Sequence, residues 1–410
     1  MLNKFKFIDL FSGIGGFHQA MVNLGGECVF ASEIDSYAIQ SYKENYNVDS
    51  NHDITKTKVE DIPQHDVLCA GFPCQPFSKA GEQLGFEDKT KGTLFFEICR
   101  ILKYHKTPYI ILENVRNLAS HDDGKTWNTI RDTLKELGYI ISDEPFIVSP
   151  HQLGIPQLRE RVIILGIHKS VGVKKLNIVL PDNDKNNIDF LKSGIVETKK
   201  VDDKYYISEH ENKVLTCWNE FVQNIRFIPS KVTDRSTKEI TYIKKDFNGT
   251  LGFPIWATEF KESYETSSIE YPWKKDFIYK NRYLYEYNKE FIDSWLKKWK
   301  YLDDFTPTEK KLEWQCGNSC KTIWDGLIQF RPSGVRVKAA NVFPALVAMV
   351  QIPIIGSVKR RLTPREAARL QSFPDTFICN SNDHQAYKQF GNAVNVKVIQ
   401  YMAEQLFSQK

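Results

Sequence analysis

The stretch VLCAGFPCQPFS, residues 67–78, begins as an apolar strand and then breaks at two prolines that flank a cysteine. Because proline has no backbone donor, Pro73 and Pro76 end the strand and leave the side chain of Cys74 facing a cleft. A cysteine in that position has the placement of a nucleophile. The alternative is a buried structural thiol, which is the usual state of cysteine, and we assign Cys69 within the strand to that class.

Further strand-like runs alternate with helical segments along the first 170 residues. Runs rich in β-branched and aromatic residues occupy 5–11, 27–34, 66–72, 109–115 and 161–167. Between them, segments 35–46 and 124–139 resemble helices in composition and spacing. Strands that alternate with helices predict an α/β fold in which a parallel sheet carries helices on both faces. Ligands of such folds bind beyond the carboxyl ends of the strands, where Cys74 is expected to lie.

The composition is that of an ordinary globular protein. The chain has 410 residues, of which 41% are hydrophobic and 26% charged, enough for two domains with buried cores. It has no apolar run of about 18 residues to span a membrane and no signal peptide, which predicts a cytoplasmic protein. The cysteines lack a disulfide framework, and the close pair Cys316 and Cys320 has no second ligand pair for zinc, so no metal site is expected.

The charge is unevenly divided along the chain. Residues 1–170 contain 18 Lys and Arg against 22 Asp and Glu, whereas the remaining residues contain 37 against 29. A polyanion would therefore prefer the second part, although an excess of this size is equally typical of a solvated surface. From about 171 to 358 the sequence is rich in Lys, Asn, Tyr and Trp and has no clear period or internal repeat. Its secondary structure is therefore not predicted.

A glycine-rich turn follows the first strand. In DLFSGIGGF, residues 9–17, three glycines permit a tight turn and a close approach of the backbone to a ligand. Glu33 lies at the end of the second strand, where a carboxylate can bind ribose hydroxyls. Position 18 is histidine rather than the glycine or alanine of a dinucleotide fingerprint, which favours an adenosyl group such as S-adenosylmethionine over NAD and disfavours an oxidoreductase. Taken alone, the turn is also compatible with a purely structural role.

Six blocks of the sequence together resemble the bacterial DNA (cytosine-5)-methyltransferase family. They are FIDLFSGIGGF (7–17), GFPCQPFS (71–78), ENV (113–115), QLRER (157–161), RRLTPREAARLQSFPD (360–375) and QFGNAV (389–394), in that family's order. The resemblance implies an α/β, S-adenosylmethionine-dependent methyltransferase with a Rossmann-like parallel sheet and a smaller target recognition domain. It places the catalytic and cofactor-binding domain at 1–170, the recognition domain at 171–384, and a C-terminal helix at 385–410 that returns to the catalytic domain.

The resemblance also implies the reaction, methyl transfer to C5 of a cytosine that is flipped out of double-stranded DNA. Cytosine C5 is a poor nucleophile until a thiolate adds at C6, and the family pattern gives this role to Cys74. Glu113 would bind N3 and the exocyclic amine in its neutral form, which requires a raised pKa. Arg161 would bind the cytosine O2 and a nearby phosphate, with Arg159 also in the active site. The structural alternatives are a helix-initiating role for Glu113 and surface ion pairs for the two arginines.

The family's cofactor contacts are carried over in the same way. They fall on Phe11, Gly13, Gly15, Glu33, Ile34, Asp53, Ile54, Pro73 and Asn392. The sequence departs from the common family pattern at two places, where His52 replaces a glycine and Ala393 replaces a serine. Neither position supplies essential chemistry, although alanine at 393 can alter the local hydrogen bonding.

Contacts with DNA are expected from both parts of the chain. Gln75 and Ser78 would hold the backbone of the flipped nucleotide, and Gln157 is placed with them as a DNA-binding residue. Arg331 and Arg336 stand on either side of a Pro-Ser-Gly turn. Arginine is the common reader of guanine in the major groove, so these two are candidates for base recognition.

Two other functions share part of this pattern. A tRNA-methylating branch has the same catalytic blocks but usually carries a Cys-Phe-Thr signature in the variable region, which this sequence lacks. A non-catalytic DNA-binding regulator would have lost Cys74 or Glu113, and both are present. The sequence therefore predicts a monomeric, site-specific methyltransferase of double-stranded DNA that shares its target with a cognate restriction endonuclease.

Overall fold

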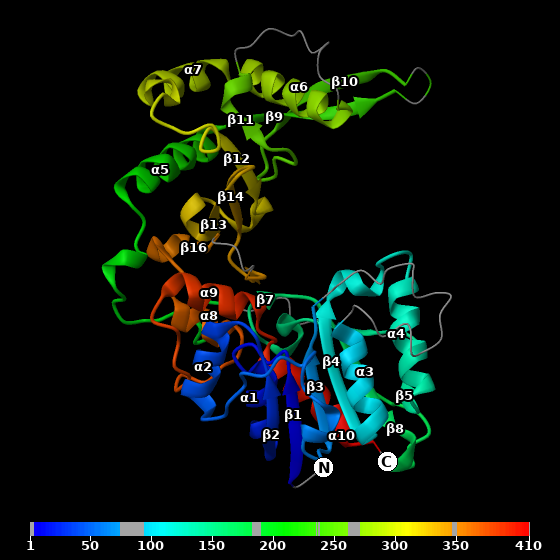
Figure 1. Cartoon of the computed structure of the whole chain (residues 1–410). Helices are drawn as coiled ribbons and strands as arrows, with labels where there is room; N and C mark the ends of the chain where they lie inside the picture. The colour runs from blue at the N-terminus through cyan, green and yellow to red at the C-terminus, as the bar shows by residue number, and fades with distance from the viewer. Residues whose placement is uncertain are drawn as a thin grey trace. The chain divides into compact units, whose positions relative to one another are not determined.

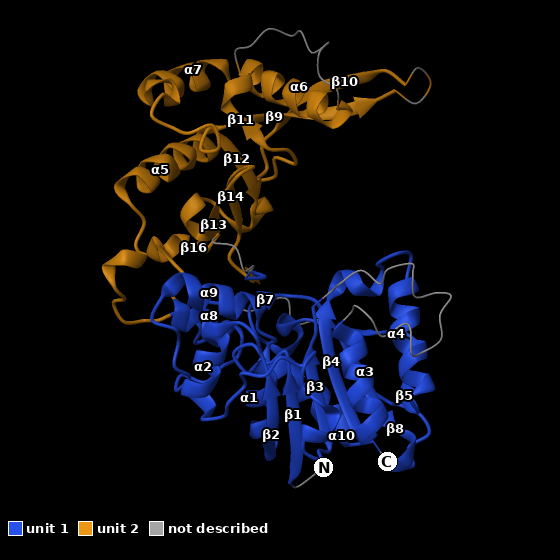
Figure 2. Ribbon diagram, in the orientation of Figure 1, with its two compact units in different colours: residues 1–196, 344–350, 364–410 blue, residues 197–343, 351–363 orange. Residues whose placement is uncertain are grey.

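The computed structural model describes residues 4–73, 94–182, 190–234, 236, 238–260, 271–346 and 351–409. The chain forms two compact units, which Figure 2 shows in blue and orange. Unit 1 contains residues 1–196, 344–350 and 364–410, and unit 2 contains residues 197–343 and 351–363. Segments 171–196 and 364–384, which the sequence predicts as parts of the recognition domain, belong to unit 1 by their contacts.

The described residues of unit 1 include a seven-stranded sheet in the order β2-β1-β3-β4-β8-β5, with β6 also paired to β8 (Figure 1). Its strands are β1 (Phe5–Leu10), β2 (Gly26–Ser32), β3 (Val67–Gly71), β4 (Tyr109–Val115), β5 (Tyr139–Ile141), β6 (Phe146–Val148) and β8 (Arg161–His168), and β7 (Gln157–Leu158) lies outside it. The α-helices of the unit are α1 (Gly16–Asn23), α2 (Ser36–Tyr46), α3 (Leu94–His105), α4 (Lys125–Glu136), α8 (Pro364–Leu370), α9 (Asp383–Asn392) and α10 (Val396–Phe407). The strands and helices predicted for residues 5–167 are therefore present.

The sheet of unit 1 is mixed, with its parallel strands side by side. β1 pairs in parallel with β2 and β3, and β3 pairs in parallel with β4. β8 runs antiparallel to β4, and β5 and β6 run antiparallel to β8. The predicted α/β sheet is confirmed, and the structure adds that the strand expected over 161–167 has the opposite direction. As a result, β8 begins at the edge of the sheet where β1, β3 and β4 end.

Helices cover both faces of this sheet, as predicted. One face packs against α3 and α4 through a cluster that includes Leu68 and Leu112 of the strands and Phe95, Ile98 and Trp127 of the helices. On the opposite face the ring of Phe407 in α10 lies 5.2 Å from that of Phe5 and 5.4 Å from that of Tyr109. β4 is accordingly buried from residue 110 to residue 114, a pattern typical of a strand covered on both sides.

Unit 2 contains a second sheet and its own core. Its strands are β9 (Phe227–Thr233), β10 (Ile240–Asp246), β11 (Ile255–Trp256), β12 (Lys311–Gln315), β13 (Gly326–Arg331), β14 (Gly334–Ala339), β16 (Ile354–Ile355) and β17 (Arg360–Arg361), while β15 (Phe343–Pro344) spans the boundary with unit 1. Its α-helices are α5 (Glu209–Asn224), α6 (Pro272–Tyr287) and α7 (Lys289–Lys298). Among the described residues, β11-β12-β14-β13-β16-β17 form a six-stranded sheet, and β9 and β10 form an antiparallel pair. The core joins Trp218 and Phe221 of α5 to Trp295 of α7 and to the sheet.

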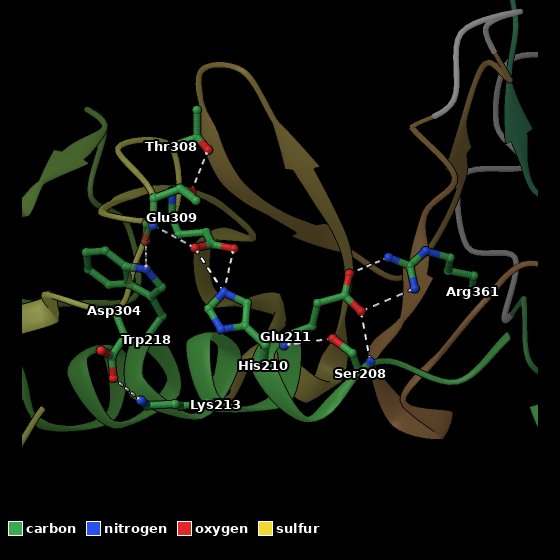
Figure 3. Close-up of polar contacts among 10 residues, drawn as sticks. Ser208, His210, Glu211, Lys213, Trp218, Asp304, Thr308, Glu309 and Arg361 are labelled. Carbon is green, nitrogen blue, oxygen red and sulfur yellow. Dashed lines mark hydrogen bonds and ion pairs between the residues drawn. The ribbon is translucent and has the colours of Figure 1, made fainter. Parts of the chain in front are cut away.

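Helix α5 is anchored by polar contacts near its first turns (Figure 3). Ser208 and Glu211 form a capping box, and Glu211 also pairs with Arg361 of β17. His210 lies 3.0 Å from Oε1 of Glu309, and the indole of Trp218 donates to the Glu309 carbonyl oxygen at 2.7 Å. These contacts join α5 to segments about 100 and 150 residues away in the sequence. None of the described helices in either unit is long and apolar enough to cross a membrane.

Candidate active site

A cavity of about 500 Å³ lies in unit 1 where β1, β3 and β4 end and β8 begins. Its volume is within the range of about 300–1,000 Å³ that is common for small-molecule sites. The lining comes from the segments after β1 and β2, the end of β3, the end of β4, the segment before β8, and α9. Nine of the residues predicted for the site line it, namely Phe11, Gly13, Glu33, Ile34, Pro73, Glu113, Arg159, Arg161 and Asn392. Six of the nine predicted cofactor residues and three of the four predicted catalytic residues therefore line one cavity.

Three predicted cofactor residues stand outside this lining. Gly15 begins α1 in the left-handed conformation, with φ at 87°. Ile54 is buried in the core that includes α3. The carboxylate of Asp53 accepts hydrogen bonds from Thr55 and pairs with Lys56 at 2.9 Å. Asp53 thus stabilises the turn that follows it.

Glu33 fixes the glycine turn through its carboxylate. Its Oε2 accepts a hydrogen bond from the backbone N–H of Gly13 at 2.8 Å. Its Oε1 accepts from the N–H groups of Ile34 and Asp35 at 2.7 and 2.9 Å. A carboxylate has about four acceptor positions, so Oε2 keeps one for a ligand hydroxyl. The neighbouring side chain of Ile34 is 76% exposed and offers an apolar surface beside that acceptor.

Residues of α9 complete the cavity and include contacts that the sequence did not predict. Lys388 pairs with Asp35 at 3.0 Å, and both residues line the cavity. Gln389 donates to the carbonyl oxygen of Tyr37 and to Ser41, which attaches α9 to α2. The sequence could have indicated these two residues only by their positions, because Asp35 closely follows Glu33 and Lys388 directly precedes the block QFGNAV. Their pairing across 353 positions of sequence carries no local pattern.

Glu113 and Arg161, both predicted as catalytic residues, form an ion pair in the cavity lining. The antiparallel register of β4 and β8 pairs Val115 with Arg161, so the end of one strand meets the start of the other. Nε of Arg161 lies 3.0 Å from Oε1 of Glu113. Burial raises the pKa of Glu113 above its ordinary value, while the charges of Arg161 and Arg159 oppose that rise. A buried carboxyl beside a cation can hold or release a proton at this point.

Arg159 is buried and ties two later parts of the chain to the site. Its Nη1 and Nη2 donate to the carbonyl oxygens of Leu346 and Ala393 at 3.2 and 2.9 Å. Its backbone N–H donates to the hydroxyl of Ser149 at 2.9 Å. Burial and the like charge of Arg161 lower the pKa of Arg159. Arg159, which lines the cavity two residues before β8, thus joins Leu346 to Ala393 at the end of α9.

The end of β3, which precedes Cys74 in the sequence, is held by Asn114, the residue after Glu113. Asn114 donates from Nδ2 to the carbonyl oxygen of Phe72 at 2.9 Å, and its Oδ1 accepts from the N–H of Val115. The bond to Phe72 holds the end of β3 against the end of β4, and the bond from Val115 orients the Asn114 side chain. Cys74, Gln75 and Ser78 lie outside the described residues, whose last member on this segment is Pro73 in the cavity wall.

The remaining DNA-binding candidates are not exposed side chains. Gln157 is fully buried, and no described residue hydrogen-bonds to its amide. In unit 2, Arg336 of β14 pairs with Glu313 of β12 at 2.5 Å, and Arg331 ends β13 with a partly buried side chain. The two arginines therefore lie on strands β13 and β14, which are paired to each other in the second sheet.

Comparison with known proteins agrees with this geometry. The model of the C-5 cytosine-specific DNA methylase family matches residues 5–408. The chain is 34% identical to the type II methyltransferase M.AluI of Cellulosimicrobium cellulans, over 97% of this chain and 91% of that protein. It is also 34% identical to M.HpaII of Haemophilus parainfluenzae, over 97% and 87%. A solved putative DNA modification methyltransferase encoded within a prophage of E. coli has a similar fold, with a TM-score of 0.57 and 20% identity over 98% of this chain and 99% of that one.

Proposed function

Since the chain belongs to the C-5 cytosine-specific DNA methylase family and is a DNA (cytosine-5-)-methyltransferase that uses S-adenosylmethionine, we propose that the cavity of unit 1 holds the cofactor and the target cytosine together. The observation that carries this proposal is that Glu33 and Glu113 line the same cavity. A shared cavity allows the methyl donor and the base to meet without an intermediate carrier.

The residues near Glu33 fit the adenosyl part of the cofactor. The free acceptor position of Glu33 Oε2 suits a ribose hydroxyl, and the exposed side chain of Ile34 suits the flat face of adenine. Phe11, Gly13, Pro73 and Asn392 complete the proposed site by their place in the lining. When bound there, S-adenosylmethionine supplies an electrophilic methyl group. The task of these residues is to hold the ligand and to exclude water around it.

Cys74 is proposed as the nucleophile. It follows Pro73, which lines the cavity, and the Asn114 bond to Phe72 fixes the strand from which the segment leaves. The thiolate of Cys74 adds to C6 of the flipped cytosine, which makes C5 nucleophilic enough to take the methyl group. Loss of the C5 proton to a base then expels the thiolate and restores the aromatic ring.

Glu113 and the two arginines are proposed to handle charge on the cytosine. Because burial raises the pKa of Glu113, its neutral form can donate a proton to N3 as electron density moves onto the ring. Arg161 can turn its remaining donors to the cytosine O2, and Arg159 supports the site from behind through its two backbone contacts. Proton delivery at N3 and thiolate attack at C6 are thus performed by neighbouring strand ends.

The rest of the biological reaction is also a proposal. The substrate is double-stranded DNA, read by unit 2 with Arg331 and Arg336 as candidates, while Gln75, Ser78 and Gln157 act near the flipped nucleotide. The similarity to type II methyltransferases supports a role in a restriction-modification system, in which the product protects a site shared with an endonuclease. A monomer suffices for this chemistry, because every proposed group comes from one chain.

Bisulfite sequencing tests the proposal directly. Plasmid DNA is prepared from a host without cytosine methylation that expresses either the wild-type protein or Cys74→Ser. Protection of cytosines in one recurring short context, lost in the variant, is the expected result. Protection that persists in Cys74→Ser would exclude Cys74 as the nucleophile. Protection of cytosines without a common sequence context would exclude site-specific methylation.

A further inference from the structure

The glycine turn beside the cavity rests on an aromatic residue of α2. Tyr46 donates from its hydroxyl to the carbonyl oxygen of Gly15 at 3.1 Å. Gly15 has φ at 87°, and a Cβ added there would overlap Cε2 of the Tyr46 ring. The ring therefore lies directly against the backbone of the turn, in a contact that glycine alone permits.

Tyr46 is itself held by a histidine of α1. The rings of His18 and Tyr46 are stacked, with centroids 3.9 Å apart and an interplanar angle of 22°. Nδ1 of His18 lies 2.7 Å from the hydroxyl of Tyr42, and that hydroxyl donates to Oδ2 of Asp9 at 3.4 Å. Because a tyrosine hydroxyl has one proton, Nδ1 of His18 is the donor in the first of these bonds. The chain of contacts thus runs from the turn to β1.

Burial disfavours charge on the groups of this cluster. It lowers the pKa of His18 to about 4 and raises the pKa of Asp9 and of Tyr46. At neutral pH His18 is therefore neutral and the hydroxyl of Tyr46 keeps its proton for the bond to Gly15. Neither His18 nor Tyr46 carries a charge toward the cavity, so the contact of Tyr46 with the turn is a geometric one.

We propose that Tyr46, oriented by His18 and Tyr42, is a positioning residue for S-adenosylmethionine. Tyr46 is not among the described residues that line the cavity, so it acts through Gly15. Besides its backbone hydrogen bonds, the turn is contacted by two side chains, Glu33 at the N–H of Gly13 and Tyr46 at the carbonyl of Gly15. The inference rests on the proposed cofactor site, because the carboxylate that fixes Gly13 is the one assigned to the ribose. If the turn is displaced, the Glu33 carboxylate that is bonded to it is displaced as well.

Tyr46→Phe tests the proposal because it removes the hydroxyl and keeps the ring. The matched control is Tyr104→Phe on α3, whose side chain is 55% exposed and distant from the cavity lining. We expect the Kd of S-adenosylhomocysteine, measured by calorimetry, to rise roughly two- to tenfold in Tyr46→Phe, the value of one hydrogen bond. The KM for S-adenosylmethionine should rise by the same factor, while kcat at saturating cofactor stays within about twofold.

The results that would overturn the proposal are distinct. An unchanged Kd in folded Tyr46→Phe would do so, as would a loss of kcat with an unchanged KM. If Tyr46→Phe does not fold, His18→Phe carries the test, since it keeps an aromatic ring against Tyr46 and loses the bond to Tyr42. A raised Kd in that variant supports the proposal and an unchanged Kd removes it. Failure of the cofactor site itself would appear separately, as an unchanged Kd in Glu33→Ala.

Discussion

Arg161 and Glu113 are ion-paired across two antiparallel strands, with 3.0 Å between Nε of the arginine and Oε1 of the glutamate. The pair stabilises the carboxylate, whereas burial favours the neutral acid. A base that occupies the cavity and draws the guanidinium toward its own oxygen would weaken the pair and favour protonation of Glu113. In the proposed mechanism, the charge of the Glu113 carboxyl would therefore depend on whether the cytosine is bound.

Glu113→Gln should keep the shape of the site and remove its acid. Glutamine can still hydrogen-bond to the cytosine but cannot protonate N3, so we expect a single-turnover methylation rate about 10²- to 10⁴-fold lower. The Kd for DNA and for S-adenosylhomocysteine should change much less. Rapid-quench measurement with labelled S-adenosylmethionine provides the rate, and a rate equal to that of the wild type would rule out proton donation by Glu113.

Glu33→Ala should weaken cofactor binding more than any single hydrogen bond would. The variant loses the proposed ribose acceptor and frees the N–H groups of Gly13, Ile34 and Asp35 at once. We expect the Kd of S-adenosylhomocysteine to rise by more than about tenfold, since bonds to a charged acceptor contribute about 1.5–3 kcal/mol each. Calorimetry measures this Kd for Glu33→Ala and for the control Glu44→Ala, which changes an exposed position of α2. Equal Kd values for the two variants would refute the assignment of Glu33 to the cofactor site.

Arg159→Met should destabilise unit 1 even though the replacement is apolar. The variant loses two charged donors to the carbonyl oxygens of Leu346 and Ala393, which are then buried without those partners. We expect the free energy of unfolding to fall by about 2–4 kcal/mol. Arg131→Met, on the surface of α4, should cost less than about 1 kcal/mol. Denaturant titration measures the free energy of unfolding of both variants. A similar loss of unfolding free energy in the two would contradict the structural role of Arg159.

His65 should make the stability of unit 1 sensitive to acid. Its two ring nitrogens bond to the Pro63 carbonyl and the Thr107 hydroxyl, and burial lowers its pKa to about 4. The unfolded chain, with a histidine pKa of about 6.5, binds more protons between pH 4 and 6.5. The contribution of His65 to the free energy of unfolding therefore falls as the pH drops through this window, by about 1.4 kcal/mol per pH unit.

The measurement is denaturant unfolding of the wild type and His65→Gln at pH 5 and pH 7. The difference in unfolding free energy between the two proteins should be larger at pH 7 than at pH 5. Taking the difference removes the contributions of other titrating groups, such as buried Asp9, whose raised pKa acts in the opposite direction. A difference that is the same at both pH values would show that His65 does not titrate as described.

The sequence predicted the elements of unit 1 well because their local patterns are strong. It did not predict the direction of β8, because a buried strand has the same apolar run in either orientation. That direction decides the site, since a parallel strand starting at Arg161 would place this arginine at the edge opposite Glu113. The two short strands β5 and β6 that separate α4 from β8 give the chain room to reverse.

Helix α6 of unit 2 could not be predicted because it does not show a simple apolar face. In α6 the buried positions include Asn281 and Arg282 beside Ile278 and Leu284. Asn281 is buried because its amide bonds to the N–H of Trp256 and to the carbonyl oxygens of Pro254 and Phe277. A polar residue that is buried because it hydrogen-bonds to the backbone of a distant segment cannot be recognised from the residues next to it in the sequence. For the same reason, the Lys388–Asp35 pair of the cavity could not be predicted from the sequence.

The wall that α9 contributes to the cavity sets an order of events during synthesis. Gly13, Glu33 and Glu113 leave the ribosome long before Asn392, and at roughly 5–20 residues per second the interval is on the order of tens of seconds. During that time the nascent chain has strand ends but no closed chamber. A polypeptide that ends before α9 would lack Asn392 and the other α9 residues of the cavity lining, so the proposed cofactor site would be incomplete.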